Sequence, residues 1–469
     1  MRRLADDLTL QNAYGQALEI LEKVGVRFES EEAVDVLKKG GARFEGNTAF
    51  ISGPLVEDAL KTAPKQDYGL AAPKRVAAGT PFSNAPFILD DETGQIRRCN
   101  IEDAVKLYQL NETSSIYECA NPGCADPLGN DAPDQFVAQI AMVLKYSDKY
   151  PSLGLRATGS TARGGDVYAS ARRAFRLVRE FHDKWDEPVM SQGICPNPPL
   201  AYDRECLDNL RAAIDEGQAV SIIPCTLGYM TGPESILGIV IHDLAMSLAG
   251  LVFVQLKSPG QAISLTNCST IGNIQTMQPN YGSAENIFIQ VLFYELCRRL
   301  ELPCTISGGY ADGTAVDYQA GMESLLTATF PFSLTEVDEV WCSPGLLTGF
   351  ACGSFHKAIL DEEMIRNANR MLQGVDLELN PQLPGLIAAG VKANSFLGVG
   401  SIKTYRRDNY MTKIFNKWGL AAADNRDKAD LAHKVEQTIK NRIAAYQPPE
   451  RSAAQRKLLQ PFLPTPCRY

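Results

Sequence analysis

The amino-acid sequence predicts an α/β protein built on a (β/α)8 TIM barrel, with an α+β N-terminal region and a helical extension at the C-terminus. Two observations support this prediction. The chain has 469 residues of ordinary globular composition, 45% hydrophobic and 22% charged. From residue 101 onwards, short apolar strand patterns alternate with helix patterns, which is typical of a parallel sheet. Eight such units fit a closed barrel better than an open sheet.

Residues 1–100 read differently from the rest of the chain. We expect helices over 1–40, a hairpin over 41–53, a helix from Pro54 through Leu60, and short strands over 64–100. The barrel is predicted to span 101–405. A charged helix over 424–446 and a proline-rich tail then form the extension, 406–469.

Eight strand–helix units account for the predicted barrel. Each strand follows a helical pattern, and proline and glycine separate many of the units. The predicted strands are 115–119, 152–156, 188–192, 219–223, 261–266, 303–307, 337–341 and 395–399.

Charge and cysteine usage narrow the class of protein. The net charge of −9, without a basic stripe, argues against nucleic acid as a partner. Twelve cysteines behind an acidic, amphipathic N-terminal segment predict reduced thiols in the cytoplasm. With four histidines and no CxxC pair, we expect no metal of its own. The apolar run 235–256 contains His242 and Asp243, so we predict a buried helix and no membrane span.

The residues that follow the strands are the candidates for the site, because loops at the carboxyl ends of barrel strands converge. They are polar, aromatic or thiol-bearing, without paired carboxylates, a Ser/His/Asp set or any histidine. We therefore predict a binding site without acid–base catalysis and name no catalytic residue. The candidate substrate-binding residues are Phe350, Tyr310, Cys342, Asn197, Tyr229, Asp312, Arg156 and Asn267.

Each candidate also has a structural alternative. Tyr229 could belong to the core, and Asn197 and Asn267 could cap loops. Asp312 could serve turn chemistry, and Arg156 could form a salt bridge at the barrel lip instead of holding a carboxylate. Phe350 and Tyr310 have helix or loop packing as their alternative. Cys342 fits a small hydrophobic wall better than a nucleophile, since no histidine lies near it in the sequence.

The glycine pair Gly308-Gly309 interrupts the chain between a strand and a helix. We expect it to let the backbone approach a ligand closely. The spacing Thr314-Ala-Val-Asp317 matches a capping box, which makes Asp317 a structural residue at a helix start.

Several segments in order resemble the trimethylamine methyltransferase superfamily, from about residue 1 to 415. They are FILDDETGQIRRCNIEDAVKLYQL (87–110), TGPESILGIVIHDLAMSLAGLVFVQLKSPG (231–260), NYGSAENIFIQVLFYELCRRLELPC (280–304), GYADGTAVDYQAGMES (309–324) and SFHKAILDEEM (354–364). The chain has only standard residues, so it resembles the branch without pyrrolysine.

The resemblance implies a (β/α)8 barrel and a methyltransferase that takes a methyl group from a quaternary amine. The implied donors are betaines such as proline betaine, glycine betaine, carnitine or γ-butyrobetaine. The implied acceptor is a Co(I) corrinoid carried by a separate partner protein. A quaternary ammonium leaves as a neutral amine, so this reaction needs no proton, which agrees with the strand-end residues. Phe350 matches a pocket aromatic of the family. A homodimer is a further expectation.

Three departures from the family pattern bear on the donor. The run His-Ala-Ala-Gly is replaced by Cys342-Ser343-Pro344-Gly345, and Leu-Pro-x-Arg by Leu302-Pro303-Cys304-Thr305. The acidic residue of a third pattern is Met246. These changes favour a betaine other than glycine betaine, with its carboxylate held by Arg156, Lys257 or Lys403. Two other functions stay open: binding of a betaine-like cation without turnover, and demethylation of a different methyl donor.

Overall fold

The main sheet consists of seven parallel strands in the order β4-β16-β15-β12-β10-β8-β7. The computed structural model describes residues 3–68, 72–82, 85–91, 93–123, 132, 134–149, 151, 153–154, 162–420 and 430–469. The strands are β4 (Arg75–Ala78), β7 (Leu153–Gly154), β8 (Ser191–Ile194), β10 (Ala219–Ile222), β12 (Ile263–Thr266), β15 (Cys304–Gly308) and β16 (Glu339–Cys342). The predicted mixed α/β fold with a parallel sheet is confirmed.

Two of the strand predictions need correction. Residues 395–399 form no strand, because this apolar run follows a helix in a turn that lies exposed to solvent. The first strand of the sheet is instead β4, which sequence analysis left among the short N-terminal strands. Its residues pair in parallel with β16, from Arg75 opposite Glu339 to Ala78 opposite Cys342. The segment predicted as strand 115–119 contributes one parallel bridge, between Tyr117 and Ala78.

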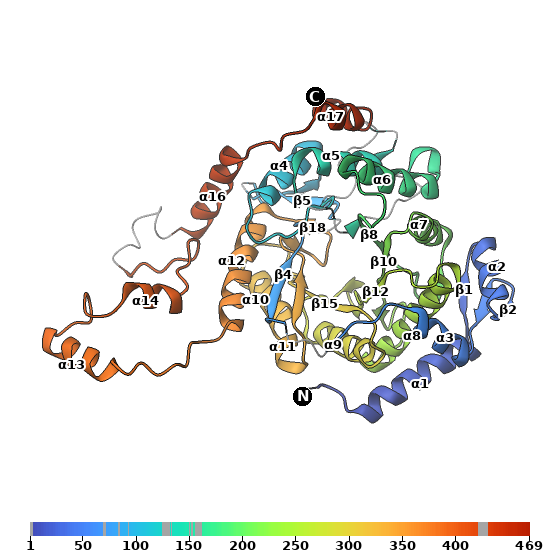
Figure 1. The fold of residues 1–469 in the computed structure, drawn as a ribbon, viewed down its shortest axis with the longest axis horizontal. Helices are drawn as coiled ribbons and strands as arrows, with labels where there is room; N and C mark the ends of the chain where they lie inside the picture. The colour runs from blue at the N-terminus through green and yellow to red at the C-terminus, as the bar shows by residue number, and fades with distance from the viewer. Residues whose placement is uncertain are drawn as a thin grey trace.

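Helices surround this sheet on its outer side (Figure 1). They are α4 (Ile101–Glu112), α5 (Gln135–Tyr146), α6 (Val167–His182), α7 (Arg204–Asp215), α8 (Ile236–Lys257), α9 (Ala284–Arg299), α10 (Tyr318–Thr329), α11 (Pro331–Leu334) and α12 (Phe355–Leu372). Most begin at a side-chain cap, which satisfies an otherwise unbonded backbone N–H. Asp317 caps α10 by accepting from the N–H of Ala320, so its structural role at a helix start is confirmed. The expected capping box was wrong, because Asp317 is itself the N-cap and the helix begins at Tyr318, not after Thr314.

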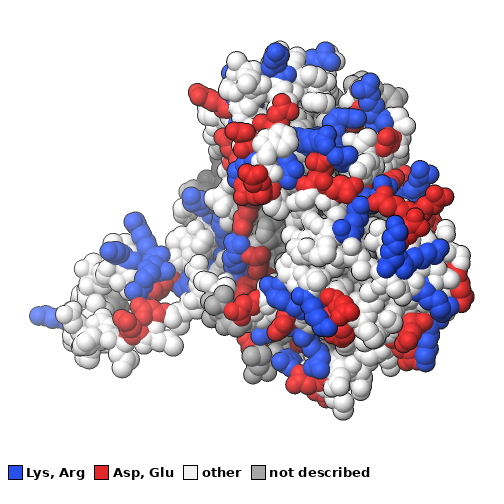
Figure 2. Space-filling model, turned by 45° about the vertical axis from the view of Figure 1, so that its right-hand side comes forward, with Lys and Arg blue, Asp and Glu red and all other residues white. Residues whose placement is uncertain are grey.

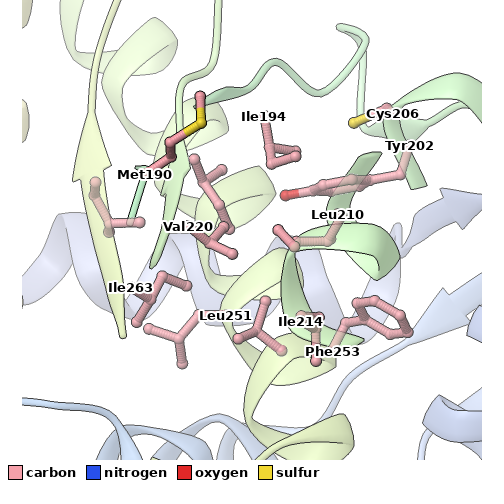
Figure 3. Close-up of a cluster of buried hydrophobic side chains, with 14 of the residues drawn as sticks. Met190, Ile194, Tyr202, Cys206, Leu210, Ile214, Val220, Leu251, Phe253 and Ile263 are labelled. Atoms are coloured by element: carbon pink, nitrogen blue, oxygen red, sulfur yellow. The ribbon is translucent and has the colours of Figure 1, made fainter. Parts of the chain in front are cut away.

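The main core lies between the sheet and these helices. Figure 3 shows side chains from β8, β10 and β12 facing those of α7 and α8. The rings of Phe28 and Tyr202 stack at 5.0 Å, and Phe253 of α8 lies 6.2 Å from Phe28. Burial of such aromatic side chains contributes strongly to stability, at about 25 cal/mol per Å² of apolar surface.

Helix α8 is long and apolar enough to cross a membrane, but 83% of its most apolar stretch is buried inside the protein. The prediction of a buried helix is therefore confirmed. The helix continues without a break through Gly250. A Cβ atom there would lie 2.2 Å from Oη of Tyr202, so the glycine permits close packing.

The N-terminal region packs against α8. It contains α1 (Asp7–Lys23), β1 (Val26–Phe28), α2 (Glu31–Lys39), β2 (Arg43–Glu45), β3 (Thr48–Phe50) and α3 (Gly53–Thr62). The hairpin and the helix from Pro54 are confirmed, whereas β1 interrupts the helices expected over 1–40. Strand β1 pairs with β3 and with β9 (Ala201–Tyr202), which follows β8.

Two small sheets lie in loops of the main domain. One contains β11 (Leu227–Gly228), β13 (Thr270–Asn273) and β14 (Gln278–Pro279); the other contains β5 (Phe87–Leu89), β6 (Ile96–Arg98), β17 (Leu346–Leu347) and β18 (Cys352–Gly353). The 3-10 segments are η1 (Arg163–Gly165) and η3 (Thr465–Cys467).

The C-terminal part begins with a segment that extends away from the body. It contains α13 (Leu383–Ala393) and α14 (Ile402–Asp408), which lie apart at the left of Figure 1. The chain then returns through α16 (Leu431–Ala445) and α17 (Ala453–Leu459). Arg442 of α16 donates to Glu362 of α12 at 2.7 Å and fastens this return to the body.

Candidate active site

The two faces of the main sheet carry different side chains. In β12, Ile263 and Leu265 are buried against the helices, whereas Ser264 and Thr266 on the opposite face are partly exposed. The hydroxyls of Thr266 and Thr305 lie 2.8 Å apart on this second face. We call it the inner face, since the helices cover the other one. It is lined by small polar side chains and is partly open to solvent.

Three cysteines meet at the carboxyl end of the inner face. Cys195 follows β8, Cys225 follows β10 and Cys268 follows β12. Cys225 and Cys268 each lie three residues beyond the paired Ile222 and Leu265, and the Cys225 thiol hydrogen-bonds with the thiols of Cys195 and Cys268. Hydrogen bonds to the Cys195 and Cys268 thiols, together with burial, raise the pKa of Cys225 well above its ordinary value. The Cys225 thiol is therefore uncharged at neutral pH and is a poor nucleophile. We call Cys195, Cys225 and Cys268 the thiol layer.

Three aromatic rings form a cluster beside the thiols. Phe350 lies 4.9 Å from Tyr281 and 5.0 Å from Tyr310, and the two tyrosine rings are 5.6 Å apart, measured between centroids. We call these three rings the aromatic cluster. Burial raises the pKa of both Tyr281 and Tyr310 well above the ordinary value, so both stay neutral. Ring faces in a site from which water is excluded attract cations.

The loops that carry the rings are fixed by two carboxylates. Asp312 accepts from the backbone N–H of Tyr281 at 3.0 Å and of Gly282 at 2.7 Å. Glu323 of α10 in turn accepts from the backbone N–H of Asp312 and of Gly313. Burial raises the pKa of Asp312, although these backbone bonds partly oppose the shift. Asp312 thus has the structural role in a turn that was its alternative to substrate binding. It lies behind the aromatic cluster and holds Tyr281 in position.

The structure brings together some of the candidates from the sequence. Tyr310 and Phe350 meet in the aromatic cluster, with Asp312 behind them. Cys342, on β16, is buried and packs against Gly309. Burial raises the pKa of the Cys342 thiol, which agrees with an inert wall. Arg156 lies outside the described residues.

Three other candidates lie elsewhere. Asn197 accepts from the N–H of Asp203, and Asn267 accepts from the N–H of Ser269, so both cap loops. Asn267 also donates to the buried Asp243 at 2.8 Å, on the helix side of the sheet. Tyr229 is 72% exposed and does not belong to the aromatic cluster.

The expected carboxylate anchors and the glycine pair also have other roles. Lys257 pairs with Glu32 at 2.6 Å at the end of α8, and Lys403 is exposed on α14. A Cβ atom on Gly308 would lie 2.4 Å from the carbonyl oxygen of Thr327. Gly308 therefore lets β15 pack against α10, whereas the expected close approach of the backbone to a ligand stays a prediction.

Sequence reasoning missed Tyr281, Cys195 and Cys268. Strand parity would have found Cys268: Asn267, one position earlier, faces the helices, whereas Cys268 faces inwards. Tyr281 stands just before the Ser283 cap of α9, in a loop that follows no strand of the main sheet. No pattern within the sequence places that loop over the strand ends.

Two further observations delimit the site. Among the described residues, no group of three or more His, Cys, Asp or Glu side chains is arranged to hold a metal ion. A cavity of about 640 Å³ lies between α1 and the last turn of α9, lined by residues such as Asp7, Tyr68 and Arg298. It opens at the amino ends of the strands, away from the thiols.

A family model described as trimethylamine methyltransferase (MTTB) matches residues 4–465 of this chain. The chain belongs to the trimethylamine methyltransferase family. The resemblance seen in the sequence is therefore confirmed over nearly the whole length.

Relatives of known function lie in the same family. The chain is 32% identical to the proline betaine:corrinoid methyltransferase of Eubacterium limosum, over 98% of this chain and 96% of that protein. It is 29% identical to the L-carnitine:corrinoid methyltransferase of the same organism, over 98% and 96%. A glycine betaine methyltransferase from Desulfitobacterium hafniense is 26% identical over 94% and 92%. The solved monomethylamine methyltransferase of Methanosarcina barkeri aligns with 96% of each chain, at a TM-score of 0.47 and 10% identity.

The thiol layer and the aromatic cluster can now be considered together in a member of this family. In this member of the trimethylamine methyltransferase family, the uncharged thiol of Cys225 and a group of aromatic rings lie at one end of a parallel sheet. Cys342, a position at which the sequence departs from the family pattern, is the last residue of β16. The described residues of the aromatic cluster and thiol layer offer no group with an ordinary pKa near neutrality, which suits chemistry without proton transfer.

Proposed function

We propose that this chain is an enzyme that transfers a methyl group from a quaternary amine to the Co(I) corrinoid of a separate protein. The observation that carries the proposal is the aromatic cluster beside the thiol layer, in a chain of this family. A buried, uncharged, aromatic wall is what binding of a permanent cation requires, since the rings replace its water.

The reaction needs little from the protein beyond positioning. The bond between the methyl carbon and nitrogen breaks, its electron pair stays on nitrogen, and a neutral tertiary amine leaves. The corrinoid supplies the nucleophile and receives the methyl group. Tyr281, Tyr310 and Phe350 would form one aromatic wall against the ammonium and exclude water from that side, while Asp312 holds the Tyr281 loop in place. Alignment of the donor and acceptor atoms accounts for the catalysis.

The inner face suits a donor that enters from the carboxyl ends of the strands. Its small side chains, such as Ser264 and Ser307, leave room beside the thiols. The donors that we propose are betaines, with proline betaine and carnitine ahead of glycine betaine, as the greater identity to the relatives with those names supports.

The experiment that tests this function is spectroscopic. The protein is mixed anaerobically with Co(I) corrinoid protein, and proline betaine, glycine betaine, carnitine, γ-butyrobetaine and trimethylamine are added in separate runs. We expect conversion of Co(I) to methyl-Co(III) absorbance with one quaternary amine and none with trimethylamine. Tight binding of a betaine without conversion would point to a binding protein. Conversion with a methylated thiol alone would point to the different donor class.

We also propose that the main sheet closes into a (β/α)8 barrel that begins at β4. Its order is cyclic: β4 lies between β16, the last strand of the main sheet along the chain, and the segment at Tyr117. Pairing of that segment with β7 would complete the ring. We further propose that the N-terminal region and the C-terminal extension lie before and after this barrel. We also propose that the protein is a homodimer in a reducing cytoplasm. A crystal structure with β7 unpaired on its outer edge would contradict the closed barrel.

A further inference from the structure

The segment 375–409, which includes α13 and α14, is an extended arm with an apolar surface. Eight of its large apolar side chains are more than half exposed, and Leu379 reaches 95%. They are Val375, Leu377, Leu379, Val391, Phe396, Leu397, Ile402 and Tyr405. Figure 2 shows this arm as a separate lobe at the left, largely white, with Lys and Arg side chains gathered beside Asp and Glu side chains.

The exposed area is too large for a monomer surface. With on the order of 150 Å² on each large apolar side chain, the arm exposes roughly 1,000 Å² of apolar surface. The largest apolar patch on an ordinary monomer is about 300–600 Å², whereas a stable interface covers about 800 Å² on each partner. The arm therefore has the area of an interface that is built to be covered.

The arm presents its apolar residues as a helical stripe. Leu383, Ile387 and Val391 recur every four residues along α13, and all three are exposed. Such a stripe on a surface helix packs against another apolar face. Within the arm, the ring of Phe396 covers Gly390, where a Cβ atom would lie 2.4 Å from it. The arm is thus internally packed at that point while its stripe is left open.

A second exposed stripe lies on the body. On α10, Tyr318, Met322 and Leu325 are 87%, 45% and 45% exposed, at the spacing of one helix face. The opposite face of α10 is buried against the sheet and α12, where Ser324 accepts from Lys357. This stripe has the same length and character as that of α13, so the two match as helix faces.

Charge is compatible with a second copy as the protein that covers the arm. Residues 375–409 contain Lys392, Lys403, Arg406 and Arg407 against Asp376, Glu378 and Asp408, a net charge of +1. Because the whole chain carries −9, the remainder carries −10. The acidic body of a second copy therefore attracts this slightly basic arm.

We propose that the arm of one copy packs its α13 stripe on the α10 stripe of a second copy, and that the exchange is reciprocal. A twofold dimer of this kind uses each patch once per copy, so both patches are covered without leaving open ends. The contact buries two apolar helix faces and places the arm, with its net charge of +1, on a body with a net charge of −10. This assembly goes beyond the proposed reaction and does not depend on it.

The test is the mass of the full chain in solution, measured by sedimentation over a dilution series. We expect a dimer for the unaltered chain. Ile387→Glu in the α13 stripe and Leu325→Glu in the α10 stripe should each weaken the dimer by roughly tenfold or more, because each buries a charge in an apolar contact. Val24→Glu, at a side chain 57% exposed at the end of α1, is the matched control and should leave the mass unchanged.

Mixing supplies a second, more specific readout. A chain with Ile387→Glu keeps an intact α10 stripe, and a chain with Leu325→Glu keeps an intact arm. Together they can form one of the two contacts, so the mixture should dimerise more strongly than either variant alone. Far-UV circular dichroism of each variant establishes that it is folded.

Three results would overturn the proposal. The unaltered chain could be a monomer throughout the dilution series. Its dimer could resist both variants, which would place the interface elsewhere. The arm could instead bind the corrinoid protein, with a mixed complex lost in Ile387→Glu while the mass of the chain alone is unaffected. Methyl transfer by a folded monomeric variant would leave the proposed function standing and separate the two questions.

Discussion

The aromatic cluster makes a quantitative prediction at Phe350. Replacement by leucine, Phe350→Leu, removes the ring that touches both tyrosines while leaving an apolar side chain of similar reach. Loss of one cation–π contact costs about 0.5–2 kcal/mol, which raises KM for a quaternary amine about 2- to 30-fold. Because the ammonium is bound in the ground state as well as in the transition state, kcat should change less.

The same change has a predictable effect on folding. Two ring pairs are lost, each worth about 0.5–1.5 kcal/mol, so the free energy of unfolding should fall by about 1–3 kcal/mol. The assay is initial-rate methylation of Co(I) corrinoid at several donor concentrations, with urea unfolding in parallel. Tyr229→Leu is the matched control, since that ring is 72% exposed outside the cluster. A Phe350→Leu enzyme with unchanged KM despite lower stability would refute a cation-binding role.

Three further predictions concern charge, backbone and thiols. Lys357→Met should destabilise the fold by about 3–5 kcal/mol, because it strands the buried Asp361, whose pKa burial already raises. Because the pKa of Asp361 is raised in the folded state, its protonated form favours folding, and the loss of unfolding free energy in Lys357→Met should shrink as pH falls. Urea unfolding of both proteins at several pH values measures this loss. A loss that does not change with pH would contradict the prediction. Gly309→Ala, at φ 75°, should cost about 1–2 kcal/mol, whereas Gly15→Ala in open space on α1 should stabilise by about 0.5–1 kcal/mol; equal thermal shifts would refute the argument. Cys225→Ser should keep most of the methyl-transfer rate, and rapid alkylation of Cys225 in the unaltered enzyme at neutral pH would show that its thiol is ionised after all.

The sequence predicted the parallel sheet because its strands are separated by long, well-capped helices. Strands such as β12 and β15 fall within one or two residues of their predicted positions. The prediction failed where an apolar run serves another purpose: residues 395–399 read as a strand but lie in the exposed arm. It also failed at β4, four residues long, whose place in the sheet depends on partners far along the chain.

The site was predicted only in part, for a physical reason. Tyr310 and Phe350 could be found because they follow strand and loop signals, but their contact with Tyr281 depends on three loops converging. Asn267 was chosen in place of Cys268 because the alternation of side chains between the two faces of a strand was not taken into account at the strand ends. The hydrogen bonds of Asp312 to backbone N–H groups cannot be read from residue types.

The division of labour between the two faces of the sheet bears on how this family diversifies. The helix-facing residues hold the fold, with Ile263 and Leu265 buried, whereas inward Ser264 and Thr266 contribute little packing. Substitutions of the second kind carry a small stability cost. New donors can therefore be explored by changing inward residues one at a time, while the fold that presents them stays above its stability threshold.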